Sequence, residues 1–331
     1  MPYNFDHPGS DYIRQINAEN FTDIALELFR HQYVNNTLYR QFADALKRTP
    51  DTVRRPADIP YLPISFFKTH RVVTGEVPQP ALIFESSRTT GDVPSRHFVK
   101  DEIVYEAALL EGFRRFYGDV EDYVILALLP SYLERGNASL VHMAKVLMAH
   151  SGHPENGFYL NEWDQLARTL QQLEARGQKV LLLGVTFALL DFAAAQPMQL
   201  KHTIVMETGG MKGRRAEWTR AQVHAYLQAQ WQMDTVHSEY GMTELLSQAY
   251  AVKEGIFECA HTMRVLVRDI NDPLDVMESG GGCINVIDLA NVHSCAFIAT
   301  EDVGKIFADG RFEVSGRMDH AALRGCNLMV L

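Results

Sequence analysis

The stretch KVLLLGVTFALLDFAAAQPMQLKHTIVMET, residues 179–208, decides the fold class of this 331-residue chain. Its two ends, KVLLLGV and HTIVMET, are short apolar runs typical of buried β-strands, and residues 187–192 between them have the pattern of a helix. A strand, a helix and a second strand in this order predict parallel strands joined by a crossover helix.

The same alternation continues on both sides of this stretch. Before it, ALIFESS and YVILALL are predicted strands, and residues 101–116 and 140–148 are predicted helices. After it, residues 216–230 form a predicted helix, and DTVHSEYG is a short strand that leads into a loop. We therefore expect an α/β fold with a mostly parallel central sheet, flanking helices, and ligand-binding loops at the carboxyl ends of the strands.

The segment before this core is predicted to be helical and then extended. Apolar residues recur at steps of three and four on both sides of the polar pair Asn35-Asn36, which predicts two amphipathic helices. These residues are Phe21, Ile24, Ala25, Leu28 and Phe29, then Leu38, Phe42 and Leu46. Pro56, Pro60 and Pro63 follow, so we expect an extended segment that joins the helices to the main sheet.

The pattern of predicted elements changes after about residue 255. The runs MRVLVRD, CINVIDL, CAFIAT, KIFAD and RFEVSG are short, β-rich and separated by Gly, Asp and Asn. They predict a smaller antiparallel lobe, in which the glycines at 280–282 form a turn. The expected division is therefore a helical N-terminus and α/β core over residues 1–250, and a β-rich lobe over residues 251–331.

Composition excludes several classes of function. With 47% hydrophobic and 22% charged residues the chain can bury a full core, and its net charge of −10 argues against a nucleic-acid partner. No apolar run is long enough to span a membrane and no leader opens the chain, so we expect a cytoplasmic protein. The four cysteines form no CxxC pair and are expected to be free thiols. Neither a Walker loop nor a GxGxxG fingerprint occurs, which weakens kinase and dehydrogenase hypotheses.

Two motifs with possible phosphate-binding residues lie at the ends of predicted strands. ESSRTTGDVPSRH, residues 85–97, gathers hydroxyl groups around Gly91, which suits a loop that wraps phosphate oxygens, although a polar turn has the same composition. YGMTE, residues 240–244, joins a strand end to an expected helix start. Its aromatic ring can stack on a base, its threonine can contact a phosphate and its glutamate can hold Mg²⁺, whereas a capped helix is the plainer alternative.

Two further motifs complete a possible nucleotide site. In ATEDVGKIFADGRFEVSGRMDHAALRG, residues 299–325, Asp302 can accept hydrogen bonds from ribose hydroxyls and Arg317 can bind phosphate or ribose oxygens. The aspartates of this stretch can equally be turn formers in hairpins. In METGGMKG, residues 206–213, Gly209 and Gly210 can flank an adenine or simply turn the chain.

Together and in this order, the four motifs resemble the adenylate-forming superfamily of acyl-CoA synthetases, adenylation domains and luciferases. That family has a phosphate loop SGTTGxPK, an adenine-flanking GG, YGxTE, and TGD followed by GRxD. Within it the chain is most similar to acyl-protein synthetases of the LuxE type, because IPYLPISFFK precedes the phosphate loop and the chain ends soon after GRxD. The resemblance covers about residue 55 to the end, and it implies the large N-terminal domain without the small C-terminal domain.

The resemblance also implies roles for individual residues. Those expected to wrap the phosphates are Ser86, Ser87, Thr89, Thr90 and Gly91. Gly209 and Gly210 would lie beside the adenine and Tyr240 would stack on it. Thr243 would contact the α-phosphate, Glu244 would hold Mg²⁺, Asp302 would bind the ribose and Arg317 the neighbouring oxygens. Cys326 would accept the acyl group as a thioester, and a packed structural cysteine is the alternative for it.

The chain departs from the family pattern at three places. Arg88 replaces the glycine of SGTTG, Val93 adds a residue before Pro94, and Glu301 replaces the middle glycine of TGD. The lysine that the small domain brings to the α-phosphate in two-domain relatives also has no counterpart, so its charge would come from Mg²⁺, Arg88, Arg96 or a partner subunit.

The function that the resemblance implies is ligase chemistry that uses ATP and Mg²⁺. A carboxylic acid, as in fatty-acid acyl-protein synthetases, would become an acyl-adenylate and then be transferred to a thiol, with an acyl reductase or acyl carrier as partner. An acyl-CoA ligase and a catalytically decayed nucleotide- or acyl-binding subunit remain alternatives. His142 and His237 are weighed as packing residues rather than catalysts, and GVTFALLDF as core rather than acyl pocket.

Overall fold

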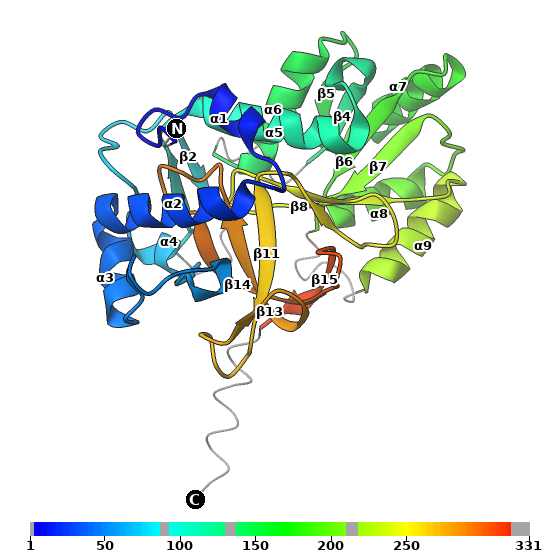
Figure 1. Ribbon diagram of the computed structural model, residues 1–331. Helices are drawn as coiled ribbons and strands as arrows, with labels where there is room; N and C mark the ends of the chain where they lie inside the picture. The colour runs from blue at the N-terminus through cyan, green and yellow to red at the C-terminus, as the bar shows by residue number, and fades with distance from the viewer. Residues whose placement is uncertain (1–2, 87–92, 130–136, 210–217, 319–331) are drawn as a thin grey trace, which may run out of the picture.

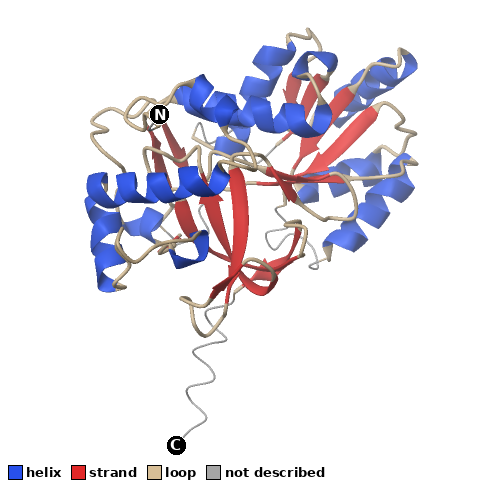
Figure 2. Cartoon of the chain, in the orientation of Figure 1, coloured by secondary structure: helices blue, strands red, loops and turns tan. Residues whose placement is uncertain are grey.

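The computed structural model describes residues 3–86, 93–129, 137–209 and 218–318. Two sheets of six and seven strands and one separate two-stranded hairpin organise this part of the chain. Figures 1 and 2 show the two larger sheets side by side, each covered by its own set of helices. The fold is mixed α/β, as the sequence predicts.

The seven-stranded sheet contains the segment that decided the fold class. Its strands, in the order β10-β9-β8-β7-β6-β4-β5, are parallel from β5 to β8 and antiparallel at β9 and β10. Their bounds are β4 Val124–Leu128, β5 Gly157–Tyr159, β6 Val180–Gly184, β7 Thr203–Glu207, β8 His237–Tyr240, β9 Ala249–Ala251 and β10 Glu258–Cys259. Every residue of β4 and β6 is buried, as expected for parallel strands that are covered on both faces.

Five helices and one 3₁₀ turn accompany this sheet. They are α5 Glu102–Tyr117, η2 Val120–Asp122, α6 Ser139–Ser151, α7 Trp163–Ala175, α8 Thr186–Ala195 and α9 Arg220–Trp231. Local sequence marks their ends: the Asp101 side chain accepts from the Ile103 amide to begin α5, and Thr219 and Gln222 form a reciprocal capping box that begins α9. Predicted strands and helices between residues 101 and 241 are confirmed, and α7 and β5 are additional.

The second sheet is built mainly from the β-rich end of the chain. Its order is β1-β14-β13-β11-β12, with β15 on β14, and all pairs are antiparallel except β1 with β14. The bounds are β1 Leu62–Pro63, β11 Met263–Arg268, β12 Val276–Met277, β13 Gly280–Asp288, β14 Phe297–Ile306 and β15 Phe312–Arg317. The antiparallel arrangement predicted after residue 255 is confirmed, except that KIFAD is no separate strand because β14 runs through Ile306.

The glycines at 280–282 do not form the predicted turn. They begin β13, opposite Ile306, Lys305 and Gly304 of β14. A Cβ atom at Gly282 would lie 2.3 Å from the carbonyl oxygen of Arg268, whereas one at Gly281 would meet no atom closer than 3.9 Å. Gly282 therefore permits a close approach between β13 and the end of β11. In sequence, a glycine used in this way looks the same as a glycine that forms a turn.

The N-terminal helices pack on the antiparallel sheet. The two predicted helices are α2 Phe21–Asn35 and α3 Thr37–Ala45, and a short helix α1, Ser10–Gln15, precedes them. The Tyr39 ring stacks on Phe297 of β14 at 6.0 Å, and the Gln32 amide donates to the carbonyl oxygens of Asn291 and Val292. Residues from both sides of the division predicted at residue 250 thus share one layer, while that division itself stays a prediction.

Two expectations for residues 55–99 are wrong. The proline-rich segment is extended only at β1, between the 3₁₀ turn η1 Pro56–Asp58 and the helical turn α4 Phe66–Thr69, and it joins the antiparallel sheet. The strand β2 Leu82–Glu85 pairs with β3 Arg96–Val99 as a hairpin and not with the parallel sheet. Among the helices of the described residues, none combines the length and apolarity needed to cross a bilayer.

Candidate active site

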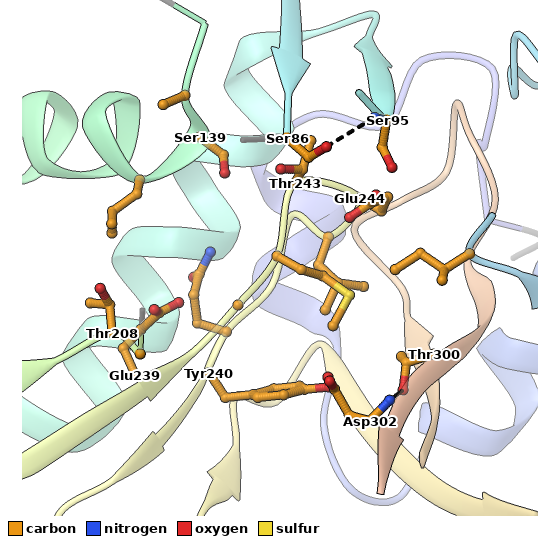
Figure 3. Close-up of a pocket in the computed structure, with 18 of the residues that line it drawn as sticks. Ser86, Ser95, Ser139, Thr208, Glu239, Tyr240, Thr243, Glu244, Thr300 and Asp302 are labelled. Atoms are coloured by element: carbon orange, nitrogen blue, oxygen red, sulfur yellow. Dashed lines mark hydrogen bonds between the residues drawn. The ribbon is translucent and has the colours of Figure 1, made fainter. Parts of the chain in front are cut away.

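A cavity of about 680 Å³ lies where the three sheets meet. Residues of the β2–β3 hairpin, the start of α6, the ends of β7 and β8, and the strands β14 and β15 line it (Figure 3). The ends of β7 and β8 are carboxyl ends of parallel strands, where open α/β sheets bind ligands.

The turn after β8 carries Thr243 and Glu244 and is held from the antiparallel sheet. The buried Asp288 carboxylate accepts from the amides of Leu246 and Ser247 at 2.7 and 3.1 Å. The Asn291 amide donates to the Glu244 carbonyl oxygen at 2.8 Å. Because side chains of distant residues satisfy this backbone, residues 241–248 form turns, and the predicted helix start after Tyr240 is wrong.

His97 fixes the same turn from the β2–β3 hairpin. Its Nδ1 lies 3.0 Å from the Thr243 carbonyl oxygen and its Nε2 lies 3.0 Å from the Asn291 side-chain oxygen. Complete burial lowers the pKa of His97 to about 4, so the ring is neutral at physiological pH. The sequence motif ends at this residue, but nothing in the local pattern indicates its partners.

One corner of the cavity combines Tyr240, Asp302 and Arg317. The Tyr240 hydroxyl donates to Asp302 Oδ2 at 2.8 Å, and Arg317 Nε donates to Asp302 Oδ1 at 3.0 Å. The Tyr240 ring packs edge-on against Phe257 and Phe312, with centroids 5.8 and 5.5 Å away. Burial, and then the Asp302 charge, raise the pKa of Tyr240 well above its usual value, which keeps its hydroxyl a donor.

A second corner is rich in hydroxyl groups. Ser86, Ser95, Thr243 and Glu244 lie together in Figure 3, and the Ser95 amide donates to the Ser86 hydroxyl at 2.9 Å. Glu244 is only 4% exposed; burial raises the pKa of its carboxyl, and a hydrogen bond from the Ser95 hydroxyl opposes this shift. Lys68, in the segment IPYLPISFFK, also lines the cavity, whereas Arg96 is exposed on β3 and does not.

A buried carboxylate holds the edge of the cavity at the end of β7. Glu207 Oε2 accepts from the Gly209 amide at 2.8 Å and from the Thr186 hydroxyl at 2.9 Å. Its Oε1 accepts from Ser238 and from Arg220. Burial opposes ionisation, yet hydrogen bonds and the Arg220 charge lower the pKa of Glu207 to about 2. Sequence reasoning missed this residue, although it lies within the METGGMKG motif, two positions before Gly209.

The structure therefore gathers most of the predicted site residues that it describes. Those lining the one cavity are Ser86, Gly209, Tyr240, Thr243, Glu244, Asp302 and Arg317. Others lie outside the described residues, namely Ser87, Arg88, Thr89, Thr90, Gly91, Gly210 and Cys326. Cys259, Cys283 and Cys295 are free thiols, as expected.

The two weighed histidines and the residues of GVTFALLDF do not line the cavity. His142 packs against the rings of Phe84 and Tyr105, and His237 lies 3.3 Å from the Tyr117 hydroxyl. Most of residues 184–192 are buried in the core. The interpretation of these residues as packing elements is in keeping with these contacts.

Three solved ligase structures have a fold similar to that of this chain. A 2-hydroxyisobutyryl-CoA ligase in complex with 2-HIB-AMP and CoA superposes with a TM-score of 0.65 at 12% identity, over 96% of this chain and 76% of the ligase. ATP-bound MatB from Rhodopseudomonas palustris gives 0.54 at 17% identity, over 74% and 49% of the two chains. A long-chain-fatty-acid-CoA ligase from Archaeoglobus fulgidus gives 0.52 at 16% identity, over 76% and 54%.

The chain has the fold of the large domain of the adenylate-forming ligases. It spans about half the length of MatB and three quarters of the 2-hydroxyisobutyryl-CoA ligase. Comparison with models of protein families gave no match, and comparison with curated proteins gave none. At these identities the likeness concerns the adenylate-forming fold, and the chemistry has to be argued from the cavity.

Proposed function

We propose that this chain binds MgATP and activates a carboxylic acid as its acyl-adenylate. The observation that carries the proposal is the single cavity shared by the hairpin hydroxyls, the turn after β8 and the Asp302 corner, three segments far apart in sequence. The adenylate-forming fold supports it, since two of the superposed ligases hold ATP or an acyl-AMP.

The Asp302 corner suits the nucleoside. Asp302 already accepts one bond at each oxygen, from Tyr240 and from Arg317, and a carboxylate has about four lone-pair sites, so it can also accept two ribose hydroxyls. Gly209 and Tyr240, which approach the cavity from neighbouring strands, would flank the adenine. Arg317 would bind phosphate or ribose oxygens.

The hydroxyl corner suits the phosphates and a magnesium ion. Ser86 leads into the motif that would wrap the phosphates with Ser87, Thr89, Thr90 and Gly91, and Thr243 would contact the α-phosphate. Glu244 fits Mg²⁺, because a buried carboxyl with a raised pKa gains a compensating charge when a cation binds it. Among the described residues, no group of three or more His, Cys, Asp or Glu side chains could hold a metal. This is compatible with Mg²⁺ held by one carboxylate, phosphates and water.

The proposed first step is an in-line displacement at the α-phosphorus. A carboxylate oxygen of the acid forms the new P–O bond, the bond to the bridging oxygen of pyrophosphate breaks, and its electron pair leaves with pyrophosphate. Bound Mg²⁺ would neutralise phosphate charge. Lys68 would add positive charge at the cavity, a role for which the sequence had suggested only Arg88, Arg96, Mg²⁺ or a partner subunit.

The proposed second step transfers the acyl group to a thiol. A thiolate attacks the acyl carbon, the bond to AMP breaks and AMP leaves with its electron pair. The resemblance to acyl-protein synthetases favours Cys326 as this thiol, a fatty acid as substrate and an acyl reductase or carrier as partner. The alternative is an acyl-CoA ligase, which the CoA bound to the 2-hydroxyisobutyryl-CoA ligase favours.

Exchange of radioactive pyrophosphate into ATP, dependent on an added acid, tests the first step. We expect exchange with at least one acid, and its loss in Glu244→Gln. Intact mass after incubation with MgATP and that acid tests the second step: an acyl adduct absent from Cys326→Ser supports the protein thioester. CoA-thioester formation that persists in Cys326→Ser supports the CoA ligase. ATP binding without exchange on any acid would instead indicate a binding subunit.

A further inference from the structure

Three polar side chains line one end of the cavity and have no part in the proposed nucleotide site. They are Thr208, Glu239 and Gln248. Thr208 follows β7, Glu239 lies in β8 and Gln248 precedes β9, and these three strands are neighbours in the sheet. Figure 3 shows Thr208 and Glu239 together, apart from both Glu244 and Asp302. This cluster is called the β7–β9 cluster below.

Two atoms of the β7–β9 cluster are buried without a partner. Thr208 Oγ1 and Gln248 Oε1 have no hydrogen bond among the described residues. Gln248 is 4% exposed, and its Nε2 donates to the Leu246 carbonyl oxygen at 3.2 Å, which makes the free atom the acceptor of the amide. A buried polar atom without a partner is unfavourable because it has lost its hydrogen bonds to water, so a ligand that completes these bonds is favoured.

The third member is the Glu239 carboxyl, whose charged neighbour is the anionic Glu207. The charge of Glu207 of β7 acts on Glu239, and the charge of Glu239 in turn acts on Tyr105 and Tyr117 of α5 and Tyr250 of β9. Burial, and then the Glu207 charge, raise the pKa of Glu239 to about 8. A cation bound beside this carboxyl would reverse that shift and leave a buried ion pair.

The backbone makes room for this carboxyl. A Cβ atom at Gly241 would lie 2.3 Å from Glu239 Oε1 and 3.7 Å from Gln248 Cγ. The glycine of the YGMTE motif therefore permits Glu239 and Gln248 to share the same end of the cavity. The arrangement is built into the fold and does not depend on a surface side chain.

We propose that the β7–β9 cluster binds the ammonium group of the acid, so that the substrate is an amino acid. This inference rests on the proposed function and names its substrate class. An ammonium group has three donors, and the Glu239 carboxylate, Gln248 Oε1 and Thr208 Oγ1 offer three acceptors. An alkyl chain at the same place would leave all three unpaired, which disfavours the fatty acid that the resemblance implies.

Matched sets of acids test the proposal by pyrophosphate exchange. Each set holds an amino acid, its hydroxy analogue and its methyl analogue, for example 4-aminobutanoate, 4-hydroxybutanoate and pentanoate. The amine is moved from carbon 2 to carbon 6 between sets, and octanoate and tetradecanoate are added. We expect one amino member to exceed its methyl analogue at least about 100-fold in kcat/KM, because a site built for a hydrogen-bonding group rejects an analogue that lacks it.

Variants of the cluster provide the second measurement. In Glu239→Gln and Gln248→Leu the preference for the amino member should fall at least about tenfold, while ATP binding by calorimetry stays at the wild-type value. Glu254→Gln, at an exposed position outside the cavity, is the matched control.

The outcomes separate this inference from the proposed function. If pyrophosphate exchange is highest with a methyl analogue or a fatty acid, the amino acid inference is overturned and the proposed acid activation remains. A hydroxy analogue as good as the amino member, or a preference unchanged in Glu239→Gln, overturns it as well. Absence of exchange with every acid overturns both.

Discussion

Replacement of Asp302 by asparagine tests the nucleotide site directly. Asp302 is 6% exposed and accepts from Tyr240 at 2.8 Å and from Arg317 at 3.0 Å, so its orientation is set before a ribose arrives. The amide of Asp302→Asn keeps one acceptor and loses the charge. A hydrogen bond to a charged group contributes about 1.5–3 kcal/mol, so loss of one raises the KM for ATP roughly 10- to 150-fold.

The assay is pyrophosphate exchange over a range of ATP concentrations, with calorimetric titration of ATP as a second measurement. Asp309→Asn is the matched control, because Asp309 lies in the same β14–β15 hairpin, is exposed, and pairs with Arg311. Circular dichroism and Tm exclude unfolding as the cause. An ATP KM within twofold of wild type in Asp302→Asn would refute the assignment of this corner to the ribose.

Three further predictions concern the metal, acid stability and the sheet. Glu244→Gln should lower exchange at least about 100-fold and weaken its dependence on Mg²⁺ concentration, as measured by Mg²⁺ titration; an unchanged Mg²⁺ profile would contradict the role of Glu244. The pKa of His97 is 6.5 when unfolded and about 4 when folded, so its contribution to stability is present above pH 6.5 and lost as pH falls towards 4. Denaturant unfolding at several pH values measures this loss in the free energy of unfolding. About 3 kcal/mol of the loss at acid pH should disappear in His97→Gln and remain in the exposed control His150→Gln. Equal pH dependence of the unfolding free energy in the two variants would contradict this role of His97. Gly282→Ala should lower the free energy of unfolding by about 1–3 kcal/mol through its clash with the Arg268 carbonyl, while Gly281→Ala, with 3.9 Å of space, costs less; equal losses would refute the packing argument.

The charge balance of the cavity links these predictions. Glu207 is ionised and fully hydrogen-bonded, whereas Glu239 and Glu244 have raised pKa values because burial removes their water. The latter two carboxyls therefore lie where a cation would stabilise them: a metal ion at Glu244 in the proposed function, and an ammonium group at Glu239 if the substrate is an amino acid. A site with two such positions suits a reaction in which MgATP and an acid bind together.

The sequence by itself determined the order and type of most elements. The runs that became β4, β6 and β7 and the helices α5, α6 and α8 have local signals, namely continuous apolar strands and helical periodicity, with a side-chain cap at the start of α5. Such signals need no knowledge of the rest of the chain. The candidate cavity was also anticipated in part. Tyr240, Thr243, Glu244, Asp302 and Arg317 were selected from motif order, and they line it together.

Only the tertiary structure decided which sheet each strand joins and what holds the site. The β2 run is as apolar as a core strand but pairs with β3 alone. The glycines at 280–282 lie in a strand because they pair with β14, and Gly282 permits the close approach of the Arg268 carbonyl. His97, Asp288 and Asn291 orient the turn after β8 from positions that are 146, 42 and 47 residues away in sequence. Such roles leave no local pattern, because a polar side chain is stabilised inside a protein by the partners that the fold brings to it.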